Sequence, residues 1–179
     1  MASQRLFFAL WPSTMVRDEL SALAQVSAPG EGRRHNSDDL HMTLVFLGQV
    51  TASQFQCIEK VADNIQVAPI GLTINHTGFW PRPKIFWAAP DHTPVQLERL
   101  VEHLNDGLRG CGFEPEQRVY KPHVTLYRKA RHVTPARLAT SISWQAREFV
   151  LASSTNSGSS TTRYQVLRRW ALEDDSNTG

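Results

Sequence analysis

The chain of 179 residues is poor in cysteine and nearly balanced in charge. Its only cysteines, Cys57 and Cys111, lie far apart in the sequence. That separation matches no metal-binding spacing, so we expect two separate, at least half-buried thiols in a reducing compartment. The net charge at pH 7 is only +2, which excludes a broadly basic nucleic-acid-binding face. Any basic patch must therefore be local.

Long apolar runs are also missing. The first apolar run extends only from Leu6 to Trp11, which is too short for a signal peptide core or a membrane span. We therefore expect a cytoplasmic protein without membrane contact. The composition is 41% hydrophobic and 20% charged, which is ordinary for a globular protein of this size. We expect one folded domain over residues 1–172 and a polar tail over residues 173–179.

Hydrophobic periodicity divides the chain into alternating strands and helices. Strands are expected at residues 4–11, 41–47, 70–80, 84–90, 123–128, 147–157 and 162–172, the last two joined by a turn at Gly158–Ser160. Helices are expected after Ser13 or Thr14, after Thr51, over residues 94–108 and, as a short segment, within "TPARLAT" at residues 134–140. This alternation alone favours a parallel α/β sheet.

Two of the expected strands begin with the same pattern. "HMTLVFLG" starts at His41 and "HVTLYR" starts at His123, so each carries His-x-Thr-Leu. Alternate side chains of a strand point to one face, about 7 Å apart along the chain. His41 and Thr43 therefore share a face, as do His123 and Thr125. A third His-x-Thr, at His132, is followed by proline, and we interpret its threonine as a helix cap.

An imidazole beside a hydroxyl suits a phosphate group. The hydroxyl donates a hydrogen bond to a phosphate oxygen, while the imidazole moves a proton near neutral pH. Two such pairs on opposite sides of a phosphodiester would separate the tasks of general base and general acid. With seven histidines in the chain, about half a His-x-Thr is expected by chance, so spacing alone leaves the paired site open.

At these motifs the chain resembles the two-histidine (2H) phosphoesterases. Within them it is similar to the bacterial RNA 2′,3′-cyclic phosphodiesterases, also called 2′-5′ RNA ligases. Four segments carry the resemblance, in the family's order: "RLFFAL", "LHMTLVFLG", "KPHVTLYR" and "TRYQVLRRWAL". The resemblance implies an α+β fold in place of the parallel sheet. In that fold two similar lobes, each an antiparallel sheet with outer helices, enclose a central cleft over residues 1–172.

The resemblance also implies the chemistry and the role of each site residue. It implies hydrolysis of a terminal 2′,3′-cyclic phosphate to a 2′-phosphate, without a metal or any other cofactor. His123 would be the proton acceptor that activates water, and His41 the proton donor to the departing 3′ oxygen. Thr43 and Thr125 would hold the non-bridging oxygens. The reverse reaction, with an RNA 5′-hydroxyl, would make a 2′-5′ linkage.

Residues around the motifs allow a functional and a plain structural interpretation. Alternation places Tyr127 on the face of His123 and Arg128 on the opposite face, so Arg128 can bind phosphate only if the strand ends or bulges there. Several aromatic residues could stack on a base, although core packing is favoured for each: Phe7, Phe8, Phe46, Trp80 and Trp87. Basic residues beside the motifs could follow an RNA backbone or simply be solvated: Arg33, Arg34, His35, Lys121, Lys129 and Arg131.

Several functions therefore stay open. The first hypothesis is a monomeric, metal-free phosphodiesterase acting on RNA ends or short oligonucleotides with a 2′,3′-cyclic phosphate. The same site could instead act on small cyclic nucleotides or 2′-5′ oligonucleotides, or bind RNA ends without turnover. A metal hydrolase ranks lowest, because neither His41 nor His123 has a nearby carboxylate or cysteine to complete a ligand set.

Overall fold

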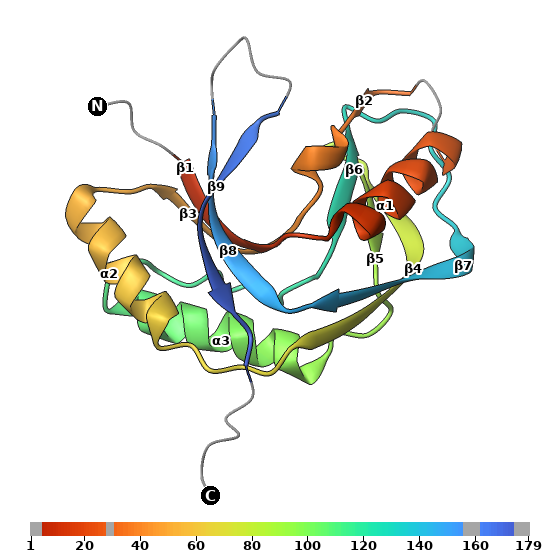
Figure 1. Ribbon diagram of the computed structural model, residues 1–179. Coiled ribbons are helices and arrows are strands. Elements are labelled where there is room, and N and C mark those ends of the chain that lie inside the picture. Colours follow the sequence, from red (N-terminus) through yellow and green to blue (C-terminus); the bar gives the residue numbers. More distant parts are fainter. Residues whose placement is uncertain (1–4, 28–30, 156–161, 174–179) are drawn as a thin grey trace, which may run out of the picture.

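The protein is an α+β molecule, seen in a computed structural model that describes residues 5–27, 31–155 and 162–173 (Figure 1). The antiparallel α+β class expected from the family resemblance is confirmed. The strands are β1 (Arg5–Leu10), β2 (Arg33–Arg34), β3 (Met42–Gln49), β4 (Ile70–Trp80), β5 (Ile85–Ala89), β6 (Val124–Arg128), β7 (Arg137–Ala146), β8 (Glu148–Ser154) and β9 (Tyr164–Ala171). The helices are α1 (Thr14–Ser27), α2 (Ala52–Asp63), α3 (Val95–Arg109) and a short 3-10 turn, η1 (Ser37–Asp39).

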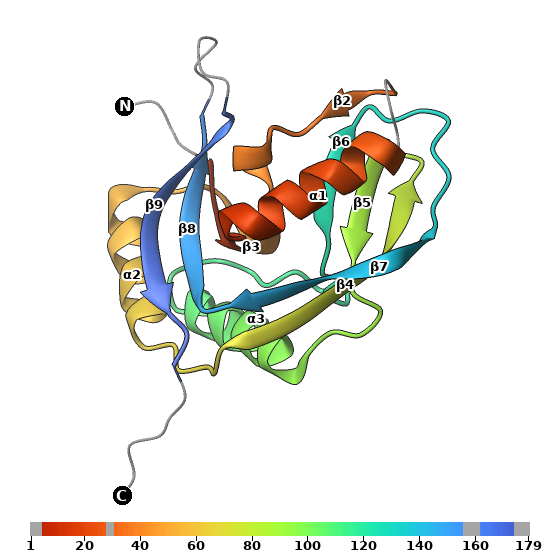
Figure 2. The ribbon, with the colours of Figure 1, turned by 45° about the vertical axis from the view of Figure 1, so that its right-hand side comes forward.

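All strand pairs among the described residues are antiparallel. The strand order is β7-β4-β5-β6-β3-β1-β8-β9, and β2 pairs with the outer part of β6. The parallel sheet that alternation alone favoured is therefore wrong. The expected halves, β4 to β7 and β1 with β3, β8 and β9, are joined into one sheet through a single pair, Met42 with Val124 (Figures 1 and 2).

The helices begin and end where local sequence directs them, and they cover different parts of the sheet. Thr51 caps α2 with a capping box in which Gln54 completes the reciprocal bond. α1 packs against β6 and β7, whereas α2 packs against α3 on the other half (Figure 2). Their buried faces, such as Leu97, Leu100 and Leu104 of α3, complete the hydrophobic core.

The segment expected to form a short helix within "TPARLAT" is part of β7, so that prediction is wrong. Its alternation becomes clear only further along, where Ile142, Trp144 and Ala146 are buried and the residues between them are exposed. Pairing with the long β4 strand outweighs the local helical preference of the Ala-Arg-Leu-Ala stretch. No helix follows Thr134 within this part of the described chain, so its expected role as a helix cap is also wrong.

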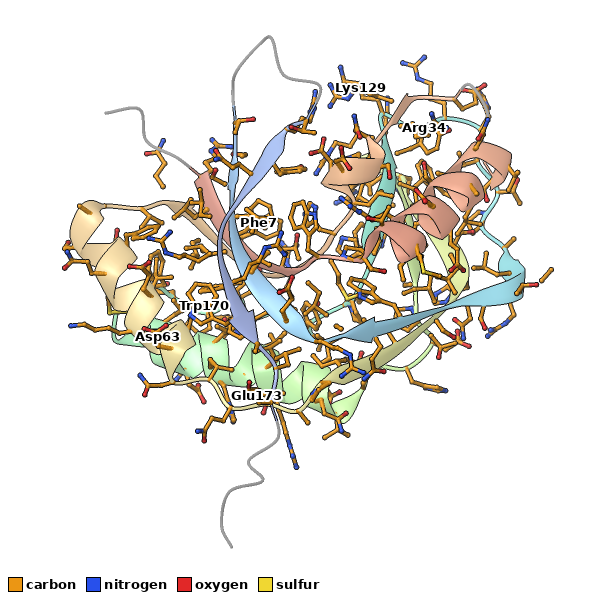
Figure 3. All side chains as sticks on the ribbon, in the orientation of Figure 1. Phe7, Arg34, Asp63, Lys129, Trp170 and Glu173 are labelled. Atoms are coloured by element: carbon orange, nitrogen blue, oxygen red, sulfur yellow. A yellow bond between two sulfur atoms is a disulfide. The ribbon has the colours of Figure 1, made fainter. Side chains whose placement is uncertain are left out.

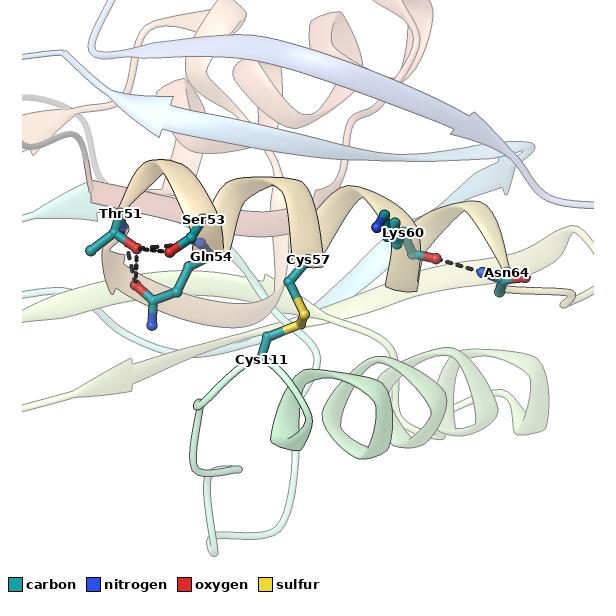
Figure 4. The surroundings of a disulfide bond; sticks show 7 residues. All are labelled: Thr51, Ser53, Gln54, Cys57, Lys60, Asn64 and Cys111. Atoms are coloured by element: carbon teal, nitrogen blue, oxygen red, sulfur yellow. Dashed lines mark hydrogen bonds between the residues drawn. A yellow bond between two sulfur atoms is a disulfide. The ribbon is translucent and has the colours of Figure 1, made fainter.

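The expected pair of separate thiols is wrong as well. Cys57 of α2 and Cys111, just after α3, form a disulfide with their Cα atoms 5.7 Å apart (Figure 4). Packing of α2 against α3 brings the two positions together across 54 residues of sequence. The sequence separation carried no signal of this contact, because the contact depends on how two amphipathic helices pack.

None of the helices in the described ranges is long and apolar enough to cross a membrane. The last described strand, β9, ends at Ala171 and is followed by the buried Leu172. The expected polar tail lies largely outside the described residues, as does the turn at Gly158–Ser160.

Candidate active site

The two His-x-Thr motifs lie on adjacent strands in mirrored register. Met42 of β3 is paired with Val124 of β6, and both side chains are fully buried. In an antiparallel ladder this pairing sets His41 opposite Thr125 and Thr43 opposite His123. These four side chains lie on the face of the sheet opposite to that of Met42 and Val124. Directly opposite residues have their Cβ atoms about 5 Å apart, and diagonal ones about 7–8 Å. The two imidazoles thus occupy one diagonal of a square, and the two hydroxyls the other.

A β-bulge follows the threonine in both motifs. On β3, Ala9 pairs with Thr43 and Phe8 with Val45, so Leu44 is the extra residue. On β6, Trp87 pairs with Thr125 and Phe86 with Tyr127, so Leu126 is the extra residue. The leucine shared by the two motifs is therefore the bulged residue in both strands.

Each bulge reverses the alternation that the sequence suggested beyond it. Leu126 and Tyr127 are both buried in the core, and Arg128 turns to the face that carries Thr125. The expectation that Tyr127 shares the face of His123 is wrong for this reason, and the condition set for Arg128 is met. On β3 the same reversal brings Phe46, with 76% of its surface exposed, to the face of Phe7.

The two imidazoles are held by equivalent hydrogen bonds. His41 Nδ1 donates to the carbonyl oxygen of Asp39 at 2.7 Å, and His123 Nδ1 donates to that of Lys121 at 2.8 Å. A carbonyl oxygen only accepts, so the proton of each neutral ring resides on Nδ1. Nε2 is then free in both rings to accept a proton, or to donate one when the ring is charged. Each motif therefore presents the same tautomer.

The rings that surround the imidazoles differ between the motifs. His41 stacks on Trp11 with centroids 4.9 Å apart, and it contacts Phe7 at 5.0 Å and Tyr164 at 4.8 Å. Among the described residues His123 contacts one aromatic side chain, Trp80, in a T-shaped arrangement with centroids 4.6 Å apart. Phe7 lies on β1 (Figure 3) and is only 4% exposed. The sequence carried no signal that Trp11 or Tyr164 would enclose His41.

The electrostatic surroundings favour neutral imidazoles. Burial lowers the pKa of His41 from its usual 6.5 to about 4, and the charges of Arg128 and His123 act in the same direction. Burial and Arg128 also lower the pKa of His123. In both rings the backbone hydrogen bond opposes the shift. The bulge at Leu126 turns Arg128 to the face of the square, and the charge of Arg128 contributes to both shifts.

Two further contacts fix the segments that precede the histidines. The buried carboxylate of Asp39 accepts hydrogen bonds from the backbone N–H groups of Arg163, at 3.0 Å, and Tyr164, at 3.3 Å. These bonds hold the start of β9 against the segment before His41. The Tyr120 hydroxyl donates to the carbonyl oxygen of Thr43 at 2.9 Å, which ties the loop before the second motif to the first motif.

His35 is buried beside this site without a hydrogen-bond partner for its Nε2 atom among the described residues. Burial lowers the pKa of His35 to about 3, and Arg128, His41, Arg163 and Arg33 contribute to the shift. A buried polar atom left unpaired costs about 1–3 kcal/mol. The sequence placed His35 only in a basic loop and gave no signal of its burial.

The aromatic candidates for base stacking differ in how much of their rings is exposed. Phe8 is fully buried in the core, and Phe7 is 4% exposed, so neither offers a free ring face. Trp87 is half-buried and lies on Gly78, where an added Cβ would lie 2.1 Å from its ring. Phe46 and, to a smaller extent, Trp80 leave aromatic surface beside the square.

The described residues contain no group of three or more His, Cys, Asp or Glu side chains that could hold a metal ion. The site instead offers two imidazoles, two hydroxyls and one guanidinium. The hydroxyls sit on β3 and β6, the imidazoles immediately before these strands, and the guanidinium at the end of β6. Such a set can move two protons and bind the oxygens of a phosphate.

Comparisons with known proteins agree with this arrangement. The sequence pattern of the 2′-5′ RNA ligase superfamily matches residues 12–156. The chain is 34% identical over 172 residues to the RNA 2′,3′-cyclic phosphodiesterase of Escherichia coli K12, with 94% of this chain and 97% of that protein covered. An RNA 2′,3′-cyclic phosphodiesterase of Bacillus subtilis is 32% identical over about half of each chain, 51% of this one and 52% of the other.

Solved structures give the same result. A crystal structure described as a phosphoesterase matches with a TM-score of 0.89 and 32% identity, covering 96% of this chain and 99% of the other. The Escherichia coli LigT protein complexed with 3′-AMP matches with a TM-score of 0.87 and 32% identity, covering 95% of this chain and 98% of the other.

Proposed function

This chain belongs to the 2′-5′ RNA ligase superfamily, and from that premise we propose that it is an RNA 2′,3′-cyclic phosphodiesterase. It opens a terminal 2′,3′-cyclic phosphate and leaves a 2′-phosphate and a 3′-hydroxyl. The observation that carries the proposal is the square of His41, Thr43, His123 and Thr125 around the Met42–Val124 pair. It presents two proton carriers and two hydroxyl donors to one phosphate.

In this mechanism His123 is the general base. Its neutral Nε2 takes a proton from water while the water oxygen attacks phosphorus. The bond from phosphorus to the 3′ oxygen breaks, and His41 Nε2 donates its proton to that oxygen. Solvent then returns both rings to their starting protonation. The hydrogen bonds from Nδ1 to the Asp39 and Lys121 carbonyls keep the two Nε2 atoms aimed at the phosphate.

The remaining polar groups stabilise the charge on phosphorus. Thr43 and Thr125 donate to the two non-bridging oxygens, whose charge grows in the transition state. The Arg128 guanidinium, turned to this face by the bulge at Leu126, adds a charge-assisted bond. Run in reverse with an RNA 5′-hydroxyl, the same transfers would form a 2′-5′ linkage.

The depressed pKa values set a condition on this mechanism. In the free enzyme at neutral pH His41 is neutral, yet a general acid must start protonated. A bound phosphodiester brings a negative charge between the imidazoles and so raises the pKa of both. The substrate itself therefore favours the protonated form of its proton donor.

Incubation with an oligoribonucleotide that ends in a 2′,3′-cyclic phosphate tests the proposal. We expect only a 2′-phosphate product, in the presence and in the absence of a metal chelator. A 3′-phosphate product, or activity abolished by the chelator, would contradict the mechanism. A protein that binds such ends but never opens them would fit the non-catalytic alternative.

We also propose that the protein is a monomer. We propose a cytoplasmic location for it, because RNA ends are the substrate. The Cys57–Cys111 disulfide is the feature that opposes this location, since disulfides are rare in reducing compartments. Alkylation of freshly lysed cells followed by mass spectrometry measures whether the two thiols are free. A pair that is fully oxidised in cells contradicts the cytoplasmic location.

A further inference from the structure

A cavity lies beside the first motif, outside the square. It has a volume of about 590 Å³, within the usual range for ligand sites. Its lining comes from β2, from η1 and from the segment before β9, and includes Arg33, Arg34, His35, Ser37, Asp39 and Arg163. The mechanism above uses none of these side chains.

The cavity is positively charged. Arg33, Arg34 and Arg163 are exposed, and none forms an ion pair with an acid in the described ranges. By contrast, the arginines of β9 are paired with Glu59 and Glu148. In a chain with a net charge of +2, this unpaired group is a local concentration of positive charge.

The acidic residues near the cavity are already engaged. Both oxygens of Asp39 accept backbone hydrogen bonds from the segment that starts β9. Asp38 pairs with Arg17 of α1 at 3.2 Å. The cavity thus offers an anion the guanidinium groups of Arg33 and Arg163, while the carboxylates of Asp38 and Asp39 already have hydrogen-bond partners.

A buried polar atom without a partner lies on the same wall. Only 7% of the surface of His35 is exposed, and its Nε2 has no hydrogen-bond partner in the part of the chain that the structure describes. A neutral imidazole donates one hydrogen bond, which an oxygen of a bound anion would accept. Buried polar atoms without partners are rare in folded proteins, so a ligand is their natural partner here.

The cavity adjoins the reaction centre. The Tyr164 ring lies 6.4 Å from the His35 ring and 4.8 Å from the His41 ring, between centroids. Arg33 pairs with Arg128 in the β2–β6 ladder, so both side chains leave on the same face. Figure 3 shows Arg34 and Lys129 at this same rim of the molecule. An anion here would be next to a phosphate held in the square.

We propose that this cavity binds the phosphodiester on the 5′ side of the terminal nucleotide, so that the enzyme selects RNA chains over cyclic mononucleotides. The inference rests on the proposed function, in which the square holds the terminal 2′,3′-cyclic phosphate. That group closes the 3′ end of the RNA, so the next phosphate of the chain lies on the 5′ side of the terminal nucleotide. Oxygens of that phosphodiester accept hydrogen bonds from Arg33, Arg163 and His35. The terminal nucleotide spans the distance to the square.

The test compares a 2′,3′-cyclic mononucleotide with a dinucleotide that ends in the same cyclic phosphate. For the unaltered protein we expect a higher kcat/KM on the dinucleotide than on the mononucleotide. The logarithm of kcat/KM should also fall more steeply with the logarithm of the salt concentration for the dinucleotide, with a slope larger by about 0.7 for the added phosphate contact. In the double variant Arg33→Ala/Arg163→Ala, the ratio of dinucleotide to mononucleotide kcat/KM falls about tenfold or more.

Arg99→Ala is the matched control, because Arg99 is exposed on α3 and equally lacks an ion pair among the described residues. It removes the same kind of charge and leaves the ratio as it was. A ratio that stays constant in the double variant overturns the inference while the proposed function stands. An unaltered protein that opens neither substrate overturns the proposed function instead. Thermal unfolding verifies that every variant is folded.

Discussion

The two motif strands share a backbone but differ in what surrounds it. Both carry His-x-Thr, both bulge at the following leucine, and both histidines donate Nδ1 to a carbonyl two residues earlier. Among the residues that the structure describes, three aromatic side chains contact His41, whereas one contacts His123. Duplication therefore supplies the reaction geometry twice, and the neighbouring segments make the two halves chemically different.

The fifth position after each histidine shows the difference most directly. Phe46 and Arg128 are equivalent in the repeat, and each reaches the site face only because its strand bulges. One half thus offers an exposed ring suited to a base, and the other a guanidinium suited to a phosphate. We therefore expect the two positions to contact different parts of one nucleotide.

Removing either imidazole should have the largest effect. We expect His41→Ala and His123→Ala each to lower kcat by roughly 10²–10⁴-fold, since each removes one proton transfer. The double variant should be little worse than the poorer single one, because the two residues act as a unit. Single-turnover assays on a cyclic-ended RNA measure this. Turnover that survives both changes breaks the comparison, because then neither motif is catalytic.

The two hydroxyls should be equal to one another. Thr43→Val and Thr125→Val keep the shape of the side chain and remove one donor to the charged phosphate. We expect each to lower kcat by about 10²-fold, the usual effect of losing such a donor. A difference larger than tenfold between the two variants would show that the substrate does not lie centrally between the motifs.

Substitutions at the fifth position after each histidine should have different kinetic effects in the two halves. Arg128→Met removes a charge-assisted bond of about 1.5–3 kcal/mol and should lower kcat/KM by about 10- to 100-fold. Phe46→Ala removes an exposed ring and should raise KM by about tenfold with little change in kcat. Steady-state kinetics on a single RNA substrate distinguish these results. A kcat effect at Phe46 as large as that at Arg128 would contradict the division of roles.

The pH dependence sharpens the contrast between free and bound enzyme. Because burial lowers the pKa of both catalytic imidazoles, the bell-shaped profile of kcat/KM should have its maximum on the acid side of pH 7. The bound phosphate raises both pKa values, so the maximum of kcat should lie at higher pH. In Arg128→Met both limbs of the kcat/KM profile should move to higher pH. Coincident kcat and kcat/KM maxima would be the contrary result.

The pH dependence of stability should reveal a further buried imidazole, His35, beside the two motifs. The folded pKa of His35, about 3, lies below its unfolded value of 6.5, so stability is complete above pH 6.5 and decreases as the pH falls. One such group contributes about 1.4 kcal/mol per pH unit in that window. His35→Gln should reduce the pH slope of the unfolding free energy by this amount between about pH 4 and 6. Denaturant unfolding at several pH values measures it, and His92→Gln, at an exposed position, is the control.

Much of this molecule could be predicted from local sequence, and the remainder depends on contacts between distant segments. The capped helix after Thr51 and the strands around each motif follow from residue order. The bulges at Leu44 and Leu126 do not, because a bulge is defined by two strands together. For this reason alternation assigned Tyr127 and Arg128 to the wrong faces. The Cys57–Cys111 bond likewise required the packing of α2 against α3.

The narrow junction between the halves has a mechanical consequence. The Met42–Val124 rung is the one backbone pairing between β3 and β6, and the reacting groups sit immediately on either side of it. When two bodies rock about a common pivot, points near the pivot travel least and points at the rim travel farthest. We therefore expect any relative motion of the halves to displace β2 and the start of β9 more than the two imidazoles.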